Sequence, residues 1–169
     1  MKTTRILITA LMALMVTMMT SCGIYSFTGA SYGTAKTVSI DYFQNRSTYV
    51  NSTLSSKITE DLKDRFMSQT PLTLVKDGGD LHFEGTITGY TITTAAIKAG
   101  ETAASNRLTI TLKVTFANQT APENDFDKSY SRYADYDVSS SFSSVESALV
   151  DEIVGMLIDD IFNDSVVNW

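Results

Sequence analysis

One segment of the chain, residues 108–116, constrains the fold more than any other. Its apolar side chains alternate with Thr and Lys without a break, and they are Leu108, Ile110, Leu112, Val114 and Phe116. Strict period-two alternation is typical of a β-strand that buries one face and exposes the other. The fold must therefore include a sheet with one covered face and one polar face.

The preceding residues 80–97 predict a second long strand with one irregularity. Apolar residues occupy odd positions in its first half and even positions in its second half, and the phase changes at Gly89. One extra residue, a β-bulge, would produce this change, and Gly85 offers a second position for a bend. With the polar tip 98–106 and the returning strand 106–119, the segment predicts a hairpin whose strands are roughly 15 residues long, against a common 5–6.

Shorter patterns predict the remaining strands. A half-buried strand is expected over residues 38–42, a short strand over 72–74 and an aromatic strand over 126–136. Residues 77–80 (DGGD) contain two glycines and indicate a hairpin turn before the long strand. A calcium loop is the alternative for this acidic turn, but the EF-hand spacing and its terminal Glu are missing.

Two amphipathic helices are also predicted. The first follows an N-cap at Asn51 or Ser52, and its apolar residues repeat every fourth position, at Leu54, Ile58, Leu62 and Phe66. The second begins with capping-box spacing from Ser143 to Glu146 and has a wider apolar set than one sheet-facing stripe requires. We expect the N-terminal tether, the C-terminal residues 166–169 or a partner to cover the remainder.

The order strand, helix, four strands, helix predicts an α+β fold. It is a two-layer sandwich, a mixed β-sheet with two helices packed on one face (β-α-β-β-β-β-α). Residues 36–169 are expected to form this single domain. Residues 22–35, rich in Gly, Ser and Thr, form a tether, and residues 1–21 a signal peptide.

The amino terminus has the features of an export signal. Two basic residues precede the uncharged apolar run 6–19, which is shorter than the about 20 residues of a bilayer span. Cys22, the one cysteine, follows Ser21 directly, and residues 19–22 (MTSC) resemble the lipobox of bacterial lipoproteins. The resemblance implies cleavage between Ser21 and Cys22 and acylation of Cys22 by fatty acids such as palmitate. The alternatives are an ordinary signal peptide cleaved a few residues later, or a buried free cysteine.

Composition narrows the class of protein. Without residues 1–21 the chain has 148 residues, enough for one domain with a core, and its formal charge changes from −6 to −8. A chain this acidic does not suit nucleic-acid binding, which needs clustered Lys and Arg to neutralise phosphates. A single cysteine excludes an intramolecular disulfide, so stability must come from burial.

No residue pattern indicates catalysis. His82, the only histidine, is expected to point outward from its strand, without a cysteine partner for a metal site or a positioned nucleophile. The chain has no Gly-x-Ser-x-Gly elbow and no phosphate-binding glycine loop, and its scattered carboxylates suit a solvated surface. We expect no enzyme, no cofactor and no metal. Lys98, Arg107 and Lys113 lie on the long hairpin and its tip, where they could contact phosphorylated lipid headgroups or pair with nearby acids.

Six segments together resemble the LptE family of lipopolysaccharide-assembly lipoproteins, in the form seen in Bacteroides-like bacteria. They are residues 22–27 (CGIYSF), 38–43 (VSIDYF), 80–90 (DLHFEGTITGY), 106–114 (NRLTITLKV), 131–136 (SRYADY) and 162–169 (FNDSVVNW). None is a catalytic signature, and together they span the mature chain.

The resemblance implies a non-enzymatic outer-membrane lipoprotein that faces the periplasm. Such a protein plugs the large β-barrel LptD, helps it fold and touches lipopolysaccharide during its insertion. No family motif identifies lipid-contacting residues in this sequence, so Lys98, Arg107 and Lys113 are candidates from their location alone. The alternative is a periplasm-facing lipoprotein that scaffolds another envelope assembly.

Overall fold

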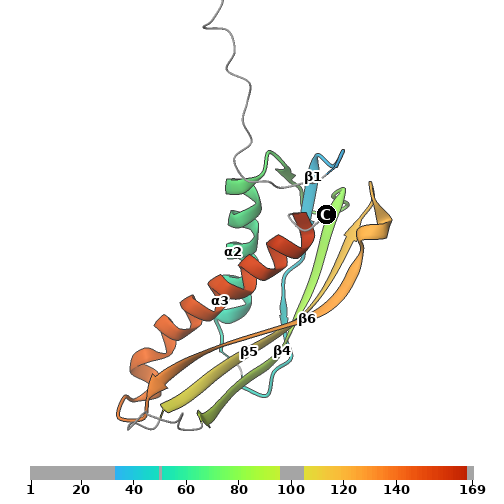
Figure 1. Cartoon of the computed structure of the whole chain (residues 1–169). Helices are drawn as coiled ribbons and strands as arrows, with labels where there is room; N and C mark the ends of the chain where they lie inside the picture. The colour runs from blue at the N-terminus through green and yellow to red at the C-terminus, as the bar shows by residue number, and fades with distance from the viewer. Residues whose placement is uncertain (1–32, 50, 96–104, 167–169) are drawn as a thin grey trace, which may run out of the picture.

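The computed structural model describes residues 33–49, 51–95 and 105–166 as one mixed sheet with two helices on one face (Figure 1). In chain order the elements are β1 (Thr37–Ile40), β2 (Gln44–Asn45), α2 (Leu54–Gln69), β3 (Thr73–Leu74), β4 (Leu81–Ala95), β5 (Ser105–Asn118), the 3-10 helix η2 (Pro122–Asn124), β6 (Phe126–Asp137) and α3 (Phe142–Val166). The predicted α+β sandwich is confirmed. The signal peptide, Cys22 and the tip residue Lys98 lie outside the described residues.

The sheet combines a parallel part with a long antiparallel part. Its strand order is β3-β1-β4-β5-β6, and β2 pairs with β4 further along that strand. β1 runs parallel to both β3 and β4, whereas β4, β5 and β6 are antiparallel neighbours. The three long strands extend together as a curved ribbon well past β1, with α3 running alongside (Figure 1).

The long hairpin contains the predicted β-bulge. Ile87 pairs with Leu112, but the next paired residue of β4 is Gly89, opposite Thr111, so Thr88 is the extra residue. Beyond the bulge, Tyr90 is buried on the same side of the sheet as Ile87. The phase change read from the sequence is therefore confirmed. At Gly85 the register with β5 is continuous, so this position has no second β-bulge.

The hairpin predicted at residues 77–80 is wrong. β3 and β4 lie on either side of β1 and run in the same direction, so the connecting segment has to cross β1. Gly78 has φ +68°, and a Cβ on Gly79 would stand 2.5 Å from the backbone nitrogen of Ser39. The two glycines therefore allow the connecting segment to cross β1 in close contact with its backbone. The Asp80 carboxylate accepts hydrogen bonds from the backbone N–H groups of Lys36 (2.8 Å) and Thr37 (3.1 Å).

Helix α2 begins at Leu54, and Thr53 at its N-cap position makes no side-chain capping hydrogen bond. The Asn51 side-chain oxygen accepts hydrogen bonds from the backbone N–H groups of Thr53 (3.0 Å) and Leu54 (3.1 Å), which supports the predicted capping role of Asn51. The four apolar residues of the predicted stripe are fully buried. Ring contacts from Phe66 to Phe83 and Phe162, both with centroids 5.1 Å apart, join α2 to the sheet and to α3.

Helix α3 begins at Phe142, two residues earlier than a capping box at Ser143 would place it. Its Glu146 carboxylate accepts hydrogen bonds from the Asn51 amide (2.8 Å) and the Tyr90 hydroxyl (2.7 Å), so the predicted capping box is wrong. The wide apolar set of α3 packs on β6 and β5 along one side and on α2 along another (Figure 1). Helix α2 therefore covers part of the apolar surface of α3 for which the sequence predicts cover by the chain termini or a partner.

Within the described residues, no helix combines the length and apolar character needed to cross a membrane.

Candidate functional site

One face of the long ribbon carries polar side chains and no helix of the described chain. We call this surface, on the side of β4, β5 and β6 opposite α2 and α3, the open face. Short hydroxyl side chains dominate it, and the exposed or partly exposed ones include Thr86, Thr91, Thr93, Thr109, Thr111, Thr115, Ser129 and Ser131. Period-two alternation produces this arrangement, because the apolar side chains of each strand point toward the helices and the polar side chains point to the opposite face.

Arg107, one of the predicted contact residues, lies on the open face in a fixed geometry. It is directly opposite Asp135 in the β5–β6 register. Its Nε and a terminal nitrogen donate hydrogen bonds of 2.7 and 2.8 Å to the two Asp135 oxygens. The guanidinium also stacks 3.6 Å from the ring centroid of Tyr133. The hydrogen bonds to Asp135 raise the pKa of the Arg107 guanidinium.

Lys113 lies on the same face but in a separate place. Six residues along β5 separate it from Arg107, which corresponds to about 20 Å along a strand. Its ammonium nitrogen is 3.0 Å from a carboxylate oxygen of Asp127, and both side chains are 54% exposed. The structure thus brings each of these two cations to an acid on β6 rather than to the other cation. The sequence did not identify Asp127, Tyr133 or Asp135, because strand pairing alone places them there.

Two further cations on β6 face the helices. Lys128 pairs with Asp164 (2.9 Å), and Arg132 makes two hydrogen bonds of 2.5 and 2.6 Å to Asp160. Both acids belong to α3, so these pairs attach the helix to the ribbon.

A polar groove of about 440 Å³ lies where β2 joins β4. Residues of both charges line it, and they are Asp41, Tyr42, Gln44, Arg46, Glu84, Gly85, Thr86, Lys113 and Thr115. Tyr42 is 54% exposed. Arg46 takes part in none of the ion pairs found in the described part of the chain. The groove therefore offers a guanidinium and an aromatic ring to an incoming ligand.

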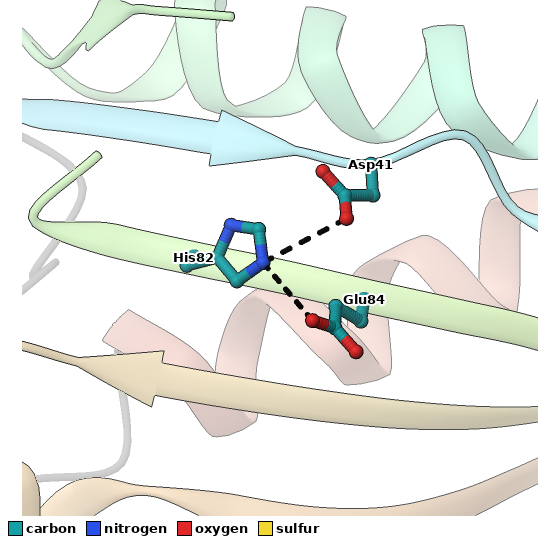
Figure 2. A group of neighbouring side chains, drawn as sticks. All are labelled: Asp41, His82 and Glu84. Carbon is teal, nitrogen blue, oxygen red and sulfur yellow. Dashed lines mark hydrogen bonds and ion pairs between the residues drawn. The ribbon is translucent and has the colours of Figure 1, made fainter. Parts of the chain in front are cut away.

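Two of the carboxylates that line this groove, Asp41 and Glu84, lie beside His82 (Figure 2). Its Nε2 is 3.4 Å from a Glu84 oxygen and 3.8 Å from an Asp41 oxygen. On the other side of the ring, Nδ1 is 2.8 Å from the Ser39 hydroxyl. The histidine points outward, as predicted, but the fold gives it two acidic neighbours that sequence reasoning missed. Asp41 comes from the segment after β1, so only strand pairing brings it close.

Serine, histidine and acid resemble the composition of a hydrolase triad, but the geometry argues against that activity. Ser39 is fully buried, and its hydroxyl oxygen also accepts a hydrogen bond from the backbone N–H of Gly79 (3.1 Å). A nucleophile must reach its substrate, and this hydroxyl is enclosed beneath the crossing segment.

Comparison with known proteins gives a family and a fold. A family model described as "LptE: Lipopolysaccharide-assembly" matches residues 35–165. A hypothetical protein from Chlamydia trachomatis aligns with a TM-score of 0.53 at 9% identity, over 78% of this chain and 98% of that one. A protein from Xanthomonas campestris aligns with a TM-score of 0.51 at 7% identity, over 79% of this chain and 84% of that one. At such identities the alignments show a shared fold. No curated protein matches the sequence.

Proposed function

Because residues 35–165 match its model, this chain belongs to the LptE family of lipopolysaccharide-assembly lipoproteins, and we propose that it assembles with an LptD-like outer-membrane β-barrel and plugs part of its lumen. The observation that carries this proposal is the family match across nearly all of the folded domain. The family's role is assembly rather than catalysis.

The proposed location follows from the amino-terminal sequence. We place the protein at the outer membrane, facing the periplasm, with acyl chains on Cys22 as its anchor. The lipobox-like residues 19–22 support acylation, and several acyl chains on one cysteine anchor a protein durably. Gly23 follows the cysteine, so the acidic residue that favours inner-membrane retention in similar lipoproteins is missing there.

The open face is the surface that suits such a partner. The interior of an outer-membrane barrel is polar, and the hydroxyl side chains of β4, β5 and β6 can exchange water for polar barrel groups without needing an apolar cover. Arg107 and Lys113 stand on this face with exposed surface, where a barrel carboxylate or a lipopolysaccharide phosphate can pair with them. Lys98, on the hairpin tip, is proposed for the same role.

Affinity purification of the acylated protein from detergent extracts tests the assignment. We expect mass spectrometry to identify a stoichiometric β-barrel of the LptD type, together with lipopolysaccharide. Stoichiometric recovery of a different envelope complex, with no such barrel, would contradict the proposal and favour the alternative role as a scaffold of another assembly.

The anchor is tested separately with Cys22→Ala. We expect the variant to fold but to lose acylation and to leave the membrane fraction when it is produced without the barrel. Retention in the membrane fraction under those conditions would show that another part of the chain provides the anchor.

A further inference from the structure

We propose that Asp41, His82 and Glu84 form a binding site for a divalent transition-metal ion of the Zn²⁺ type. The ligand atoms of the three side chains all lie within 4.8 Å of one another (Figure 2). One imidazole nitrogen with two carboxylate oxygens is a donor set that Zn²⁺ accepts.

Backbone pairing fixes the positions from which the three side chains project. His82 and Glu84 are alternate residues of β4, so both point to the open face. The backbone N–H of Asp41 donates a 2.9 Å hydrogen bond to the carbonyl of Phe83, the residue between them. The backbone of the third ligand, Asp41, is thereby held beside the other two ligands by a main-chain hydrogen bond, independent of any ion.

A contact at Nδ1, on the side of the ring away from the carboxylates, also orients the His82 imidazole. The Ser39 oxygen, fully buried, lies 2.8 Å from His82 Nδ1 and directs Nε2 toward the carboxylates. A metal on Nε2 requires the proton on Nδ1, and the two lone pairs of a serine oxygen can accept hydrogen bonds from both Nδ1–H and the Gly79 N–H. Histidine ligands in metal sites regularly donate their other ring N–H to such a partner.

Electrostatics favours a cation at this place. Among the ion pairs of the described residues, Asp41 and Glu84 each have His82 as their partner and no Lys or Arg. Two other acids of the open face, Asp127 and Asp135, are each neutralised by a cation of β5. Asp41 and Glu84 are thus two neighbouring carboxylates with no Lys or Arg of the described chain within ion-pair distance, and a divalent ion would neutralise them.

Small side-chain movements would complete the coordination. Zn²⁺ binds imidazole and carboxylate ligands at about 2.0–2.2 Å, so the ligand atoms have to approach one another slightly. The Asp41 and Glu84 side chains are 46% and 64% exposed, so solvent rather than packed protein surrounds much of each carboxylate. Three protein ligands leave a coordination position open toward the groove, where water or an anionic ligand can bind.

Zn²⁺ titration of the mature chain tests the site, with Cys22→Ala in every sample so that no thiol competes. Isothermal titration calorimetry should show saturable binding of one ion. Because His82 is the only histidine, its ring ¹⁵N resonances report the site directly and should move to the pattern of an Nδ1–H, Nε2-bound imidazole. Mg²⁺, which prefers oxygen ligands, should not displace the Zn²⁺.

Three variants and one control assign the ligands. His82→Asn, Asp41→Asn and Glu84→Gln should each weaken Zn²⁺ binding by at least about tenfold, with circular dichroism unchanged. Glu123→Gln, which removes one exposed carboxylate from η2, should bind like the parent. The proposal is overturned if no saturable binding occurs up to millimolar Zn²⁺, if the histidine resonances do not move, or if the three variants bind as tightly as the control.

Discussion

The ring of Phe43 fills the space above Gly85 that a side chain would otherwise occupy. A Cβ on Gly85 would stand 2.0 Å from a ring carbon of Phe43, which is fully buried. The Phe43 backbone N–H also donates to the Thr59 hydroxyl of α2 (3.1 Å). This contact fixes the short segment between β1 and β2 against both layers, and so positions the neighbouring Asp41 and Tyr42 at the groove.

Gly85→Ala should therefore destabilise the protein. The added methyl group cannot coexist with the Phe43 ring in its present position, and overpacking of this kind costs about 1–3 kcal/mol in free energy of unfolding. Urea denaturation provides the measurement. Gly155→Ala in α3 is the matched control, because a Cβ there meets nothing within 4 Å. That variant should gain about 0.5–1 kcal/mol from helix propensity, and an equal loss in both variants would contradict the Phe43 explanation.

Leu112→Ala should cost much more stability than Thr111→Ala. Leu112 is fully buried on the helix side of β5, where such truncations cost about 2–5 kcal/mol. Thr111 lies on the open face and has one side-chain hydrogen bond, 3.0 Å to the Ser131 hydroxyl, so its loss should cost about 1 kcal/mol or less. Similar midpoint shifts for both variants in a denaturation series would show that the faces of this strand are misassigned.

The elements most accurately predicted from the sequence are those whose signal is local. The alternation of residues 108–116 and the phase change at Gly89 depend on which side of one strand each residue faces, and both are confirmed. The hairpin predicted at residues 77–80 was wrong because two glycines indicate a tight backbone but not the strand that the chain reaches next. That β1 lies between β3 and β4 is a non-local pairing that no local pattern encodes.

The candidate sites show the same limit. The alternation of apolar and polar residues around His82 was sufficient to predict that its side chain points outward. It could not place Asp41 beside His82, since 41 residues separate them and the contact depends on β1 pairing with β4. Equally, Arg107 and Lys113 were recognised as surface cations, but their partners Asp135 and Asp127 follow from the β5–β6 register.

Asp80→Asn should reduce the loss of stability on acidification. Hydrogen bonds from the Lys36 backbone and from the Thr37 hydroxyl and backbone lower the pKa of the Asp80 carboxyl in the folded protein. The stabilisation that the ionised Asp80 carboxylate gives the folded state is therefore present above the unfolded pKa of about 4. It is lost as the pH falls through the lower pKa of the folded state. Denaturation midpoints between pH 6 and pH 3 should fall less steeply for Asp80→Asn, and Asp77→Asn, an exposed neighbour, should follow the parent. Parallel curves for Asp80→Asn and parent would contradict this role.

As the pH rises in the alkaline range, Tyr130→Phe should lose stability less steeply than the parent protein. Burial, reinforced by the hydrogen bond to Asp164 (3.0 Å), raises the pKa of the Tyr130 phenol above its usual value. The folded state thus keeps the proton more tightly, and this contribution is present below the unfolded pKa of about 10 and is lost as the pH rises beyond it. Thermal unfolding between pH 8 and pH 11 should show the difference. Tyr42→Phe, with its exposed side chain, should not change the slope.

The last prediction concerns the open face. Two double variants, Arg107→Gln with Asp135→Asn and Lys113→Gln with Asp127→Asn, remove one ion pair each without changing the net charge. Because these pairs are exposed, folding should be little affected. If the open face contacts the barrel or lipopolysaccharide, both double variants, and Lys98→Gln at the tip, should weaken barrel copurification or lipopolysaccharide binding several-fold. Arg132→Gln with Asp160→Asn removes a pair on the helix side and serves as the control. Unchanged binding by the open-face variants, or equal weakening in the control, would mean that the open face is not the contact surface.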